Sequence, residues 1–96
     1  MATSKIESYI GFAIRKGSAY FGVDNVIESR KKPKVILFDK KLSERSQTRL
    51  QRYAETAGIP SFEYNLSDAL PHKNCLALGI ADGSLAEAII SVIKEI

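Results

Sequence analysis

Two short runs of apolar residues constrain this chain most, because such runs are typical of strands buried on both faces of a sheet. They lie at 35–38 and 75–80, and two further candidate strands lie at 18–21 and 59–64. Apolar residues at helical spacing predict helices over 4–17, 43–58 and 82–96. A second, shorter helix is expected to begin at or next to residue 24 and to end within the basic segment 30–33, and a single helical turn fits 67–70. Strands that alternate with helices predict an α/β domain with helices on both faces of a mixed or mostly parallel sheet. The expected architecture is a three-layer α-β-α sandwich with a four-stranded mixed sheet.

Length and local signals set the expected organisation. A chain of 96 residues without a linker or a repeat is expected to form one domain, residues 1–96. The single cysteine, Cys75, allows no internal disulfide. No signal pattern begins the chain, and no apolar run approaches the roughly 20 residues that span a bilayer. We therefore expect a cytoplasmic protein without a membrane partner.

Catalytic signals are sparse. His72 and Cys75 are the only histidine and the only thiol, whereas a zinc site normally takes four ligands. Cys75 falls inside an apolar run, where a buried, inert thiol is the ordinary interpretation. The glycines at 17 and 22 fit neither a Walker A loop nor a dinucleotide-binding loop. We expect no enzyme, no metal and no cofactor.

The charge is distributed unevenly. Residues 1–52 hold 12 Lys/Arg against 5 Asp/Glu, whereas residues 53–96 hold 2 against 6. This imbalance predicts a positive face, and a positive face favours a polyanion such as nucleic acid. One cluster is Arg30, Lys31, Lys32 and Lys34; a second is a stripe of Lys41, Arg45, Arg49 and Arg52 along the third expected helix. The alternative is that these side chains only solvate exposed surface.

The segment 12–27, FAIRKGSAYFGVDNVI, resembles the N-terminal signature of the kink-turn-binding ribosomal protein superfamily, which includes ribosomal proteins L-seven-Ae and L-thirty-e. That signature is a helix that ends in a basic residue and glycine, a short strand, then glycine and a polar pair that opens a helix. The runs VILFD, GIP and LGIAD follow in the family's order over nearly the whole chain. The resemblance implies an L-thirty-e-like fold and an RNA-binding, ribosome-associated protein.

The resemblance also implies a contact surface. Gly22 matches the glycine that lets the backbone approach RNA, and Asp24 and Asn25 occupy the positions of the pair that reads sheared base pairs. Residues 66–72 occupy a loop that packs on flipped bases, and His72 with Lys73 offers a phosphate or base contact. The candidate RNA-binding residues are Lys16, Ser18, Gly22, Asp24, Asn25, Arg30, Lys31, Lys32, Lys40, His72 and Lys73. Partners are then structured RNA and ribosomal proteins, with the chain a monomer or a weak dimer.

Several positions depart from the family pattern. Ser18 and Glu28 stand where the family has lysines, Asp24 takes the first slot of the pair, and Ser67 and Pro71 replace two loop glycines. These changes remove positive charge from the implied site. The alternative hypothesis is therefore a protein-interaction or scaffold module of the same fold that has lost kink-turn binding, with surplus apolar residues on the last helix as its contact surface.

Overall fold

The structure is a computed structural model that describes residues 5–66 and 75–95. Its elements are α1 (Lys5–Lys16), β1 (Ala19–Phe21), α2 (Val23–Ile27), β2 (Val35–Phe38), α3 (Glu44–Ala57), β3 (Ser61–Glu63), β4 (Ala77–Ile80) and α5 (Gly83–Glu95). No helix in these ranges is both long and apolar enough to cross a membrane. Residue 4, where the first predicted helix begins, the predicted helical turn at 67–70 and residue 96, where the last predicted helix ends, lie outside the described residues.

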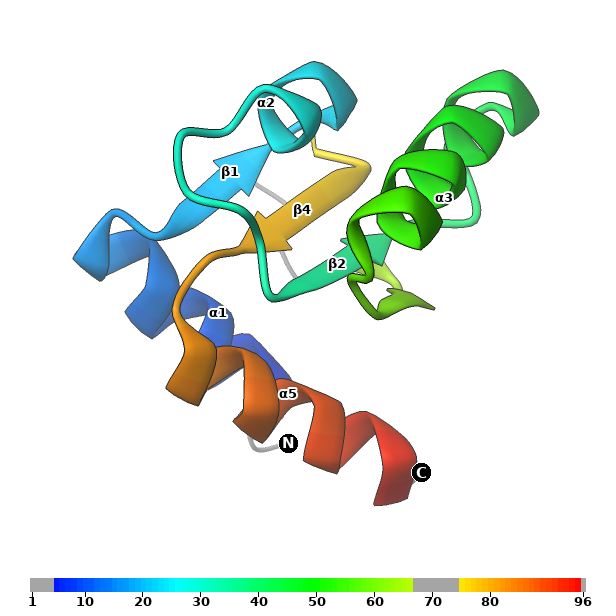
Figure 1. Ribbon diagram of the computed structural model, residues 1–96. Coiled ribbons are helices and arrows are strands. Elements are labelled where there is room, and N and C mark those ends of the chain that lie inside the picture. Colours follow the sequence, from blue (N-terminus) through cyan, green and yellow to red (C-terminus); the bar gives the residue numbers. More distant parts are fainter. Residues whose placement is uncertain (1–4, 67–74, 96) are drawn as a thin grey trace.

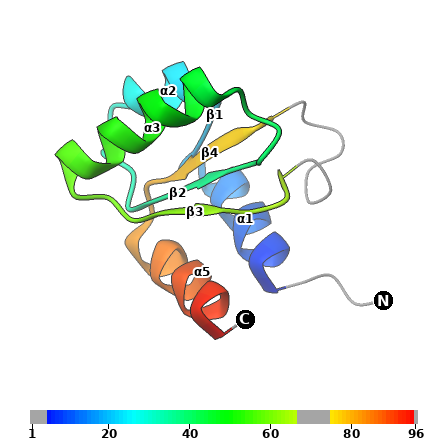
Figure 2. The same ribbon diagram turned by 90° about the vertical axis from the view of Figure 1, so that its right-hand side faces the viewer.

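The four strands form one mixed sheet in the order β1-β4-β2-β3. Strands β2 and β3 run parallel, and β4 is antiparallel to both β1 and β2. Helices α2 and α3 cover one face of the sheet, and α1 and α5 lie side by side on the other (Figures 1 and 2). The predicted α/β class with a four-stranded mixed sheet is confirmed.

Strand β2 shows why the sheet is apolar on both faces. Val35 and Leu37 pack into the cluster formed with α1 and α5. Ile36 and Phe38 pack into the cluster formed with α2 and α3. Successive side chains of a strand point to opposite faces, so a strand between two helical layers needs an apolar residue at every position.

The bounds of several elements differ from those predicted; strand β1, for example, begins at Ala19 and not at residue 18. Strand β3 begins at Ser61 because the Ile59 N–H donates to the Ala54 carbonyl at 2.8 Å and so closes helix α3 instead of joining the sheet. Cys75 is buried but precedes β4, so its predicted place inside the strand is wrong. Helix α2 ends at Ile27, well short of residue 32. Helix α3 is as expected, with Ser43 as its N-cap and Gly58 in the left-handed conformation after it.

Candidate nucleic-acid interface

Strands β1, β2 and β3 end at the same edge of the sheet, and β4 begins there. We call this the Gly22 edge and define it by Gly22, Asp39, Tyr64 and Leu76. The Gly22 N–H donates to the Ala77 carbonyl, and the Asp39 N–H donates to the Leu76 carbonyl, both at 2.9 Å. The Tyr64 N–H donates to the Phe38 carbonyl, also at 2.9 Å. Loops from three separate parts of the chain are therefore fixed next to one another.

Gly22 and Asn25 form the part of this edge that the resemblance singled out. Gly22 has a φ of 90° and a ψ of 151°, a backbone conformation nearly restricted to glycine. The Asn25 side-chain N–H donates to the Phe21 carbonyl at 2.7 Å, which orients the exposed amide on the surface of α2. An amide held in this way can still accept a hydrogen bond through its oxygen and donate one through its second N–H.

Asn25 also lines a hollow of about 480 Å³ beside the outer edge of β1. Residues from β1, Tyr20 and Phe21 among them, form one wall, and Glu28 and Arg30 from the end of α2 and the loop after it lie on the other. Strand β1 is an edge strand, so its outer backbone groups are not used by the sheet. The lining includes an amide from Asn25 and a guanidinium from Arg30, whereas the rings of Tyr20 and Phe21 pack on opposite faces of β1, against the α2–α3 and the α1–α5 clusters.

Asp24 does not stand alone. Its carboxylate is paired with Arg49 of α3, with 2.6 Å between Asp24 Oδ1 and Arg49 Nη1. Both side chains are exposed, so the pair adds little to stability. It does, however, offset a negative charge that would repel phosphate, and it places the guanidinium of Arg49 next to the start of α2.

Lys16 and Ser18 lie at the other end of the short sheet. We call this the Asp82 edge and define it by Ser18, Lys34, Ala81 and Asp82. The Ala81 N–H donates to the Ser18 carbonyl at 2.8 Å, and the Lys34 N–H donates to the Ile80 carbonyl at 2.7 Å. A three-residue strand rises about 10 Å, so this edge is separated from the Gly22 edge by about that distance.

Both candidate residues at the Asp82 edge have partners within the chain. The Lys16 ammonium forms an ion pair with the Asp82 carboxylate, which also accepts from the Leu85 N–H at the start of α5. The Lys16 hydrogen bond, with that of Leu85, holds the pKa of Asp82 below its ordinary value of 3.8. The Ser18 hydroxyl donates to the Ala13 carbonyl at 3.2 Å. These two side chains therefore fasten α1 to the fold and are set apart from Gly22 and Asn25.

The turn between β2 and α3 places two further lysines at the Gly22 edge. Asp39 is the one charged residue that is buried in the described part of the chain, and its carboxylate accepts from the Lys41 N–H at 2.9 Å. This bond holds the turn in which Lys40 and Lys41 are exposed. Lys40 lines a second hollow with Glu63, Tyr64 and Asn65. Lys41 precedes α3, so its predicted place on that helix is wrong.

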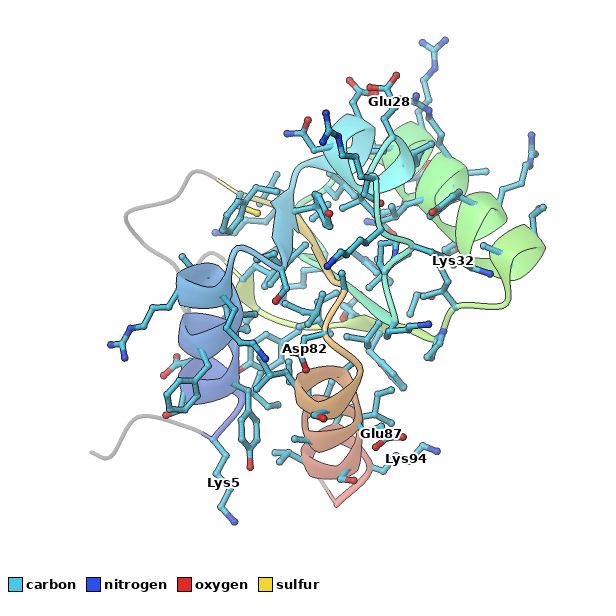
Figure 3. The ribbon with its side chains drawn as sticks, turned by 60° about the vertical axis from the view of Figure 1, so that its left-hand side comes forward. Lys5, Glu28, Lys32, Asp82, Glu87 and Lys94 are labelled. Atoms are coloured by element: carbon cyan, nitrogen blue, oxygen red, sulfur yellow. The ribbon has the colours of Figure 1, made fainter. Side chains whose placement is uncertain are left out.

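Positive charge gathers in residues 28–43, between α2 and α3, which hold six Lys/Arg against two Asp/Glu, whereas the two helices themselves hold three of each. Residues 22–58, which carry α2 and α3, hold nine Lys/Arg against five Asp/Glu. Residues 5–16 and 82–95, which carry α1 and α5, hold four against four. Figure 3 shows Lys32 and Glu28 on the α2–α3 side, and Lys5 and Lys94 at the far end of the other layer. Arg30, Lys31, Lys32 and Lys34 are all exposed in the loop from α2 to β2, which crosses from one edge to the other.

Sequence reasoning alone did not identify a groove between α2 and α3. Three of the predicted stripe residues, Arg45, Arg49 and Arg52, line it, together with Ile27 from α2 and Tyr53 from α3. Its volume is about 660 Å³, against about 480 Å³ for the hollow beside β1. The basic stripe in the sequence indicates one wall of the groove, but it does not indicate that α2 forms the opposite wall.

The remaining candidate residues are the histidine and the lysine at 72 and 73, and metal binding is the remaining chemistry to consider. His72 and Lys73 lie outside the described residues. Over 5–66 and 75–95, no group of three or more His, Cys, Asp or Glu side chains could hold a metal ion.

The apolar residues of α5 are largely used within the fold. Ile89 is buried, and Ile90, Val92 and Ile93 pack against the core. Within the described ranges, the one exposed large hydrophobic is Phe12, with Arg15 over its ring. The surface on which the scaffold alternative relied is thus largely covered by the chain itself.

Comparison with known proteins supports the fold alone. No family model and no curated protein matches the sequence. Among solved structures, a protein of unknown function from Bacillus halodurans is similar with a TM-score of 0.83 and 17% sequence identity. The match covers 94% of this chain and 97% of that one. The chain is therefore an α/β protein whose arrangement of helices and strands also occurs in that protein from Bacillus halodurans.

Proposed function

We propose that this chain is a non-catalytic RNA-binding protein, associated with the ribosome, that recognises structured, kink-turn-like RNA. The observation that carries the proposal is the excess of positive charge in residues 28–43, the segment that joins α2 to α3 through β2. This segment has an excess of four positive charges, whereas α2 with α3, and residues 5–16 with 82–95, hold equal numbers of basic and acidic residues. A phosphate backbone is the polyanion that such a basic segment suits.

The Gly22 edge supplies the groups that would read the RNA. Asn25 presents an oriented amide, and Tyr20 and Phe21 of β1 are among the residues that line the hollow beside it. Arg30 lines the same hollow and can contact a phosphate. The order of motifs in residues 12–27, which resembles the kink-turn-binding superfamily, supports a kinked RNA as the target.

The departures from the family pattern are compatible with this function. Asp24 is neutralised by Arg49, so the first slot of the pair does not face the RNA as an isolated negative charge. Glu28 stays exposed at the hollow, next to Arg30 in its lining. We therefore propose that contacts to phosphate come from the α2–β2 loop and from α3, in place of the lysines at the family positions.

The test is a binding titration with two charge-reversal variants. Lys31→Glu/Lys32→Glu changes the α2–α3 layer, and Lys5→Glu/Lys94→Glu changes the other layer by the same total charge. All four side chains are exposed. Screening over about 8 Å at physiological salt confines each effect to its own face. We expect the first variant to weaken binding to a kink-turn RNA by about tenfold or more and the second to change it little.

Salt is the second variable in that titration. Neutralised phosphates release counterions, so affinity should fall steeply between 50 and 200 mM salt. An affinity for RNA that does not change between these two concentrations would contradict the proposal. Equal weakening by both double variants would contradict the assignment to the α2–α3 layer.

A further inference from the structure

The groove between α2 and α3 has a composition that the Gly22 edge does not explain. We call it the arginine groove and define it by Ile27, Arg45, Arg49, Arg52 and Tyr53. Three guanidinium groups from one helix line it, and the half-buried Ile27 and Tyr53 form its apolar part. The three arginines are exposed, and none of the acidic residues of α2 or α3 lines the groove.

The spacing of these arginines suits a nucleic-acid backbone. Positions 45, 49 and 52 span seven residues, which is about 10 Å along a helix axis. Successive phosphates of one strand in a stacked helix are about 3.4 Å apart along the axis. Three guanidinium groups can therefore reach two or three successive phosphates, and arginine binds phosphate with paired, parallel hydrogen bonds.

The apolar part of the groove favours RNA over an acidic protein segment. Tyr53 packs against the core on one side and lines the groove on the other. An aromatic ring beside phosphate-binding arginines is a surface on which an unpaired base can stack. Acidic side chains of a peptide would satisfy the guanidinium groups but would make no use of such a ring.

Arg49 connects the groove with the Gly22 edge. Its guanidinium lines the groove and is also paired with Asp24, two residues after Gly22. A strand bound at the Gly22 edge could thus continue past Arg49 into the groove without leaving the positive layer.

We propose that the arginine groove is a second RNA-binding site, which holds the phosphate backbone of the strand that flanks the element recognised at the Gly22 edge. This inference rests on the proposed function. The groove would supply affinity that does not depend on sequence, and the Gly22 edge would supply the preference for a kinked RNA.

The test uses Arg45→Gln/Arg52→Gln, which keeps the Asp24–Arg49 pair intact. Lys5→Gln/Lys94→Gln is the matched control, because it removes the same charge from the other layer. The probes are a kink-turn RNA with a ten-nucleotide single-stranded flank and its unkinked counterpart. Thermal unfolding of each variant checks that the fold is kept.

We expect the groove variant to show a shallower salt dependence. Each lost phosphate contact lowers the slope of log K against log salt by about 0.7 to 0.9. If two contacts are lost, the ratio of the wild-type affinity to the variant affinity should fall by about tenfold as salt rises from 50 to 200 mM. The preference for kinked over unkinked RNA should stay unchanged in both variants.

Other outcomes separate the two proposals. If the wild type binds the kinked RNA but the groove variant keeps its salt slope, the groove proposal is wrong and the proposed function stands. If the slope is unchanged while binding to an oligoglutamate peptide is lost, the groove is a site for an acidic protein, which also overturns the proposal. If the wild type binds neither RNA, the proposed function itself fails.

Discussion

Gly22→Ala tests whether the backbone at the candidate interface is as constrained as the structure indicates. An alanine side chain would meet no atom within 4 Å, so the substitution creates no clash. Its cost comes from the φ of 90° and ψ of 151°, which only glycine adopts readily and which cost other residues about 1–3 kcal/mol. The hydrogen bonds from the Gly22 N–H to Ala77 and from the Val26 N–H to the Gly22 carbonyl oppose relaxation.

The net effect follows from two opposing contributions. Alanine also gives the unfolded chain less conformational entropy than glycine does, which raises the free energy of unfolding by about 0.4–1 kcal/mol. We expect a net loss of about 1.5 kcal/mol in the free energy of unfolding. The entropy of unfolding is about 2.1 cal/mol/K per residue, or about 0.2 kcal/mol/K for this chain, so Tm should fall by about 7 °C.

Gly11→Ala is the matched control for this substitution. Gly11 lies within α1, also with no atom within 4 Å of the added side chain, and it has no positive φ. Alanine is favoured over glycine inside a helix by about 0.5–1 kcal/mol, so Tm should rise by about 3–5 °C. Thermal unfolding followed by circular dichroism measures both variants. A Gly22→Ala protein as stable as Gly11→Ala would refute the reasoning.

Three further substitutions probe the rest of the fold. Asp82→Asn removes a carboxylate whose pKa is lowered in the folded protein by Lys16. The variant should therefore be less stable than the wild type in urea unfolding, by an amount that is constant above the ordinary pKa of 3.8. That difference should shrink as the pH falls below 3.8, because the wild-type carboxylate then becomes protonated. A difference that grows in acid would contradict this sign. Ser43→Ala removes the cap whose hydroxyl accepts from the Ser46 N–H, and should cost about 1 kcal/mol by chemical denaturation; an unchanged midpoint would show that the cap is dispensable. Leu50→Ala should lower the free energy of unfolding by about 2–5 kcal/mol, because the Leu50 side chain is fully buried on the inner face of α3. A loss below about 1 kcal/mol would contradict that burial.

The sequence predicted those elements whose signals are local. The apolar run at 35–38 is a strand because it is packed on both faces, and the helix between Ser43 and Gly58 has both of its end signals within the segment itself. The limits of the other strands depend on pairing with distant backbone. Ile59 has the composition of a strand residue, yet its N–H is used by Ala54 at the end of α3.

The candidate site was predictable only in part. Gly22 and Asn25 were found from the order of residues around them, and the structure places them together at one edge of the sheet. The ion pair between Asp24 and Arg49 could not be predicted, because these residues are 25 positions apart in the sequence. Lys16 and Asp82 are 66 apart. Such pairs depend on how helices pack, and no local pattern encodes that.

The measurement that tests the central claim most directly compares the affinity of the wild type and of Asn25→Ala for a kink-turn RNA and for an unkinked RNA of the same composition. We expect the wild type to prefer the kinked RNA. In the Asn25→Ala variant, the ratio of the affinity for kinked RNA to that for unkinked RNA should be about tenfold lower, which corresponds to lost hydrogen bonds worth about 1.4 kcal/mol. The salt dependence of binding should not change. Equal affinity of the wild type for both RNAs would contradict recognition of a kinked RNA at the Gly22 edge.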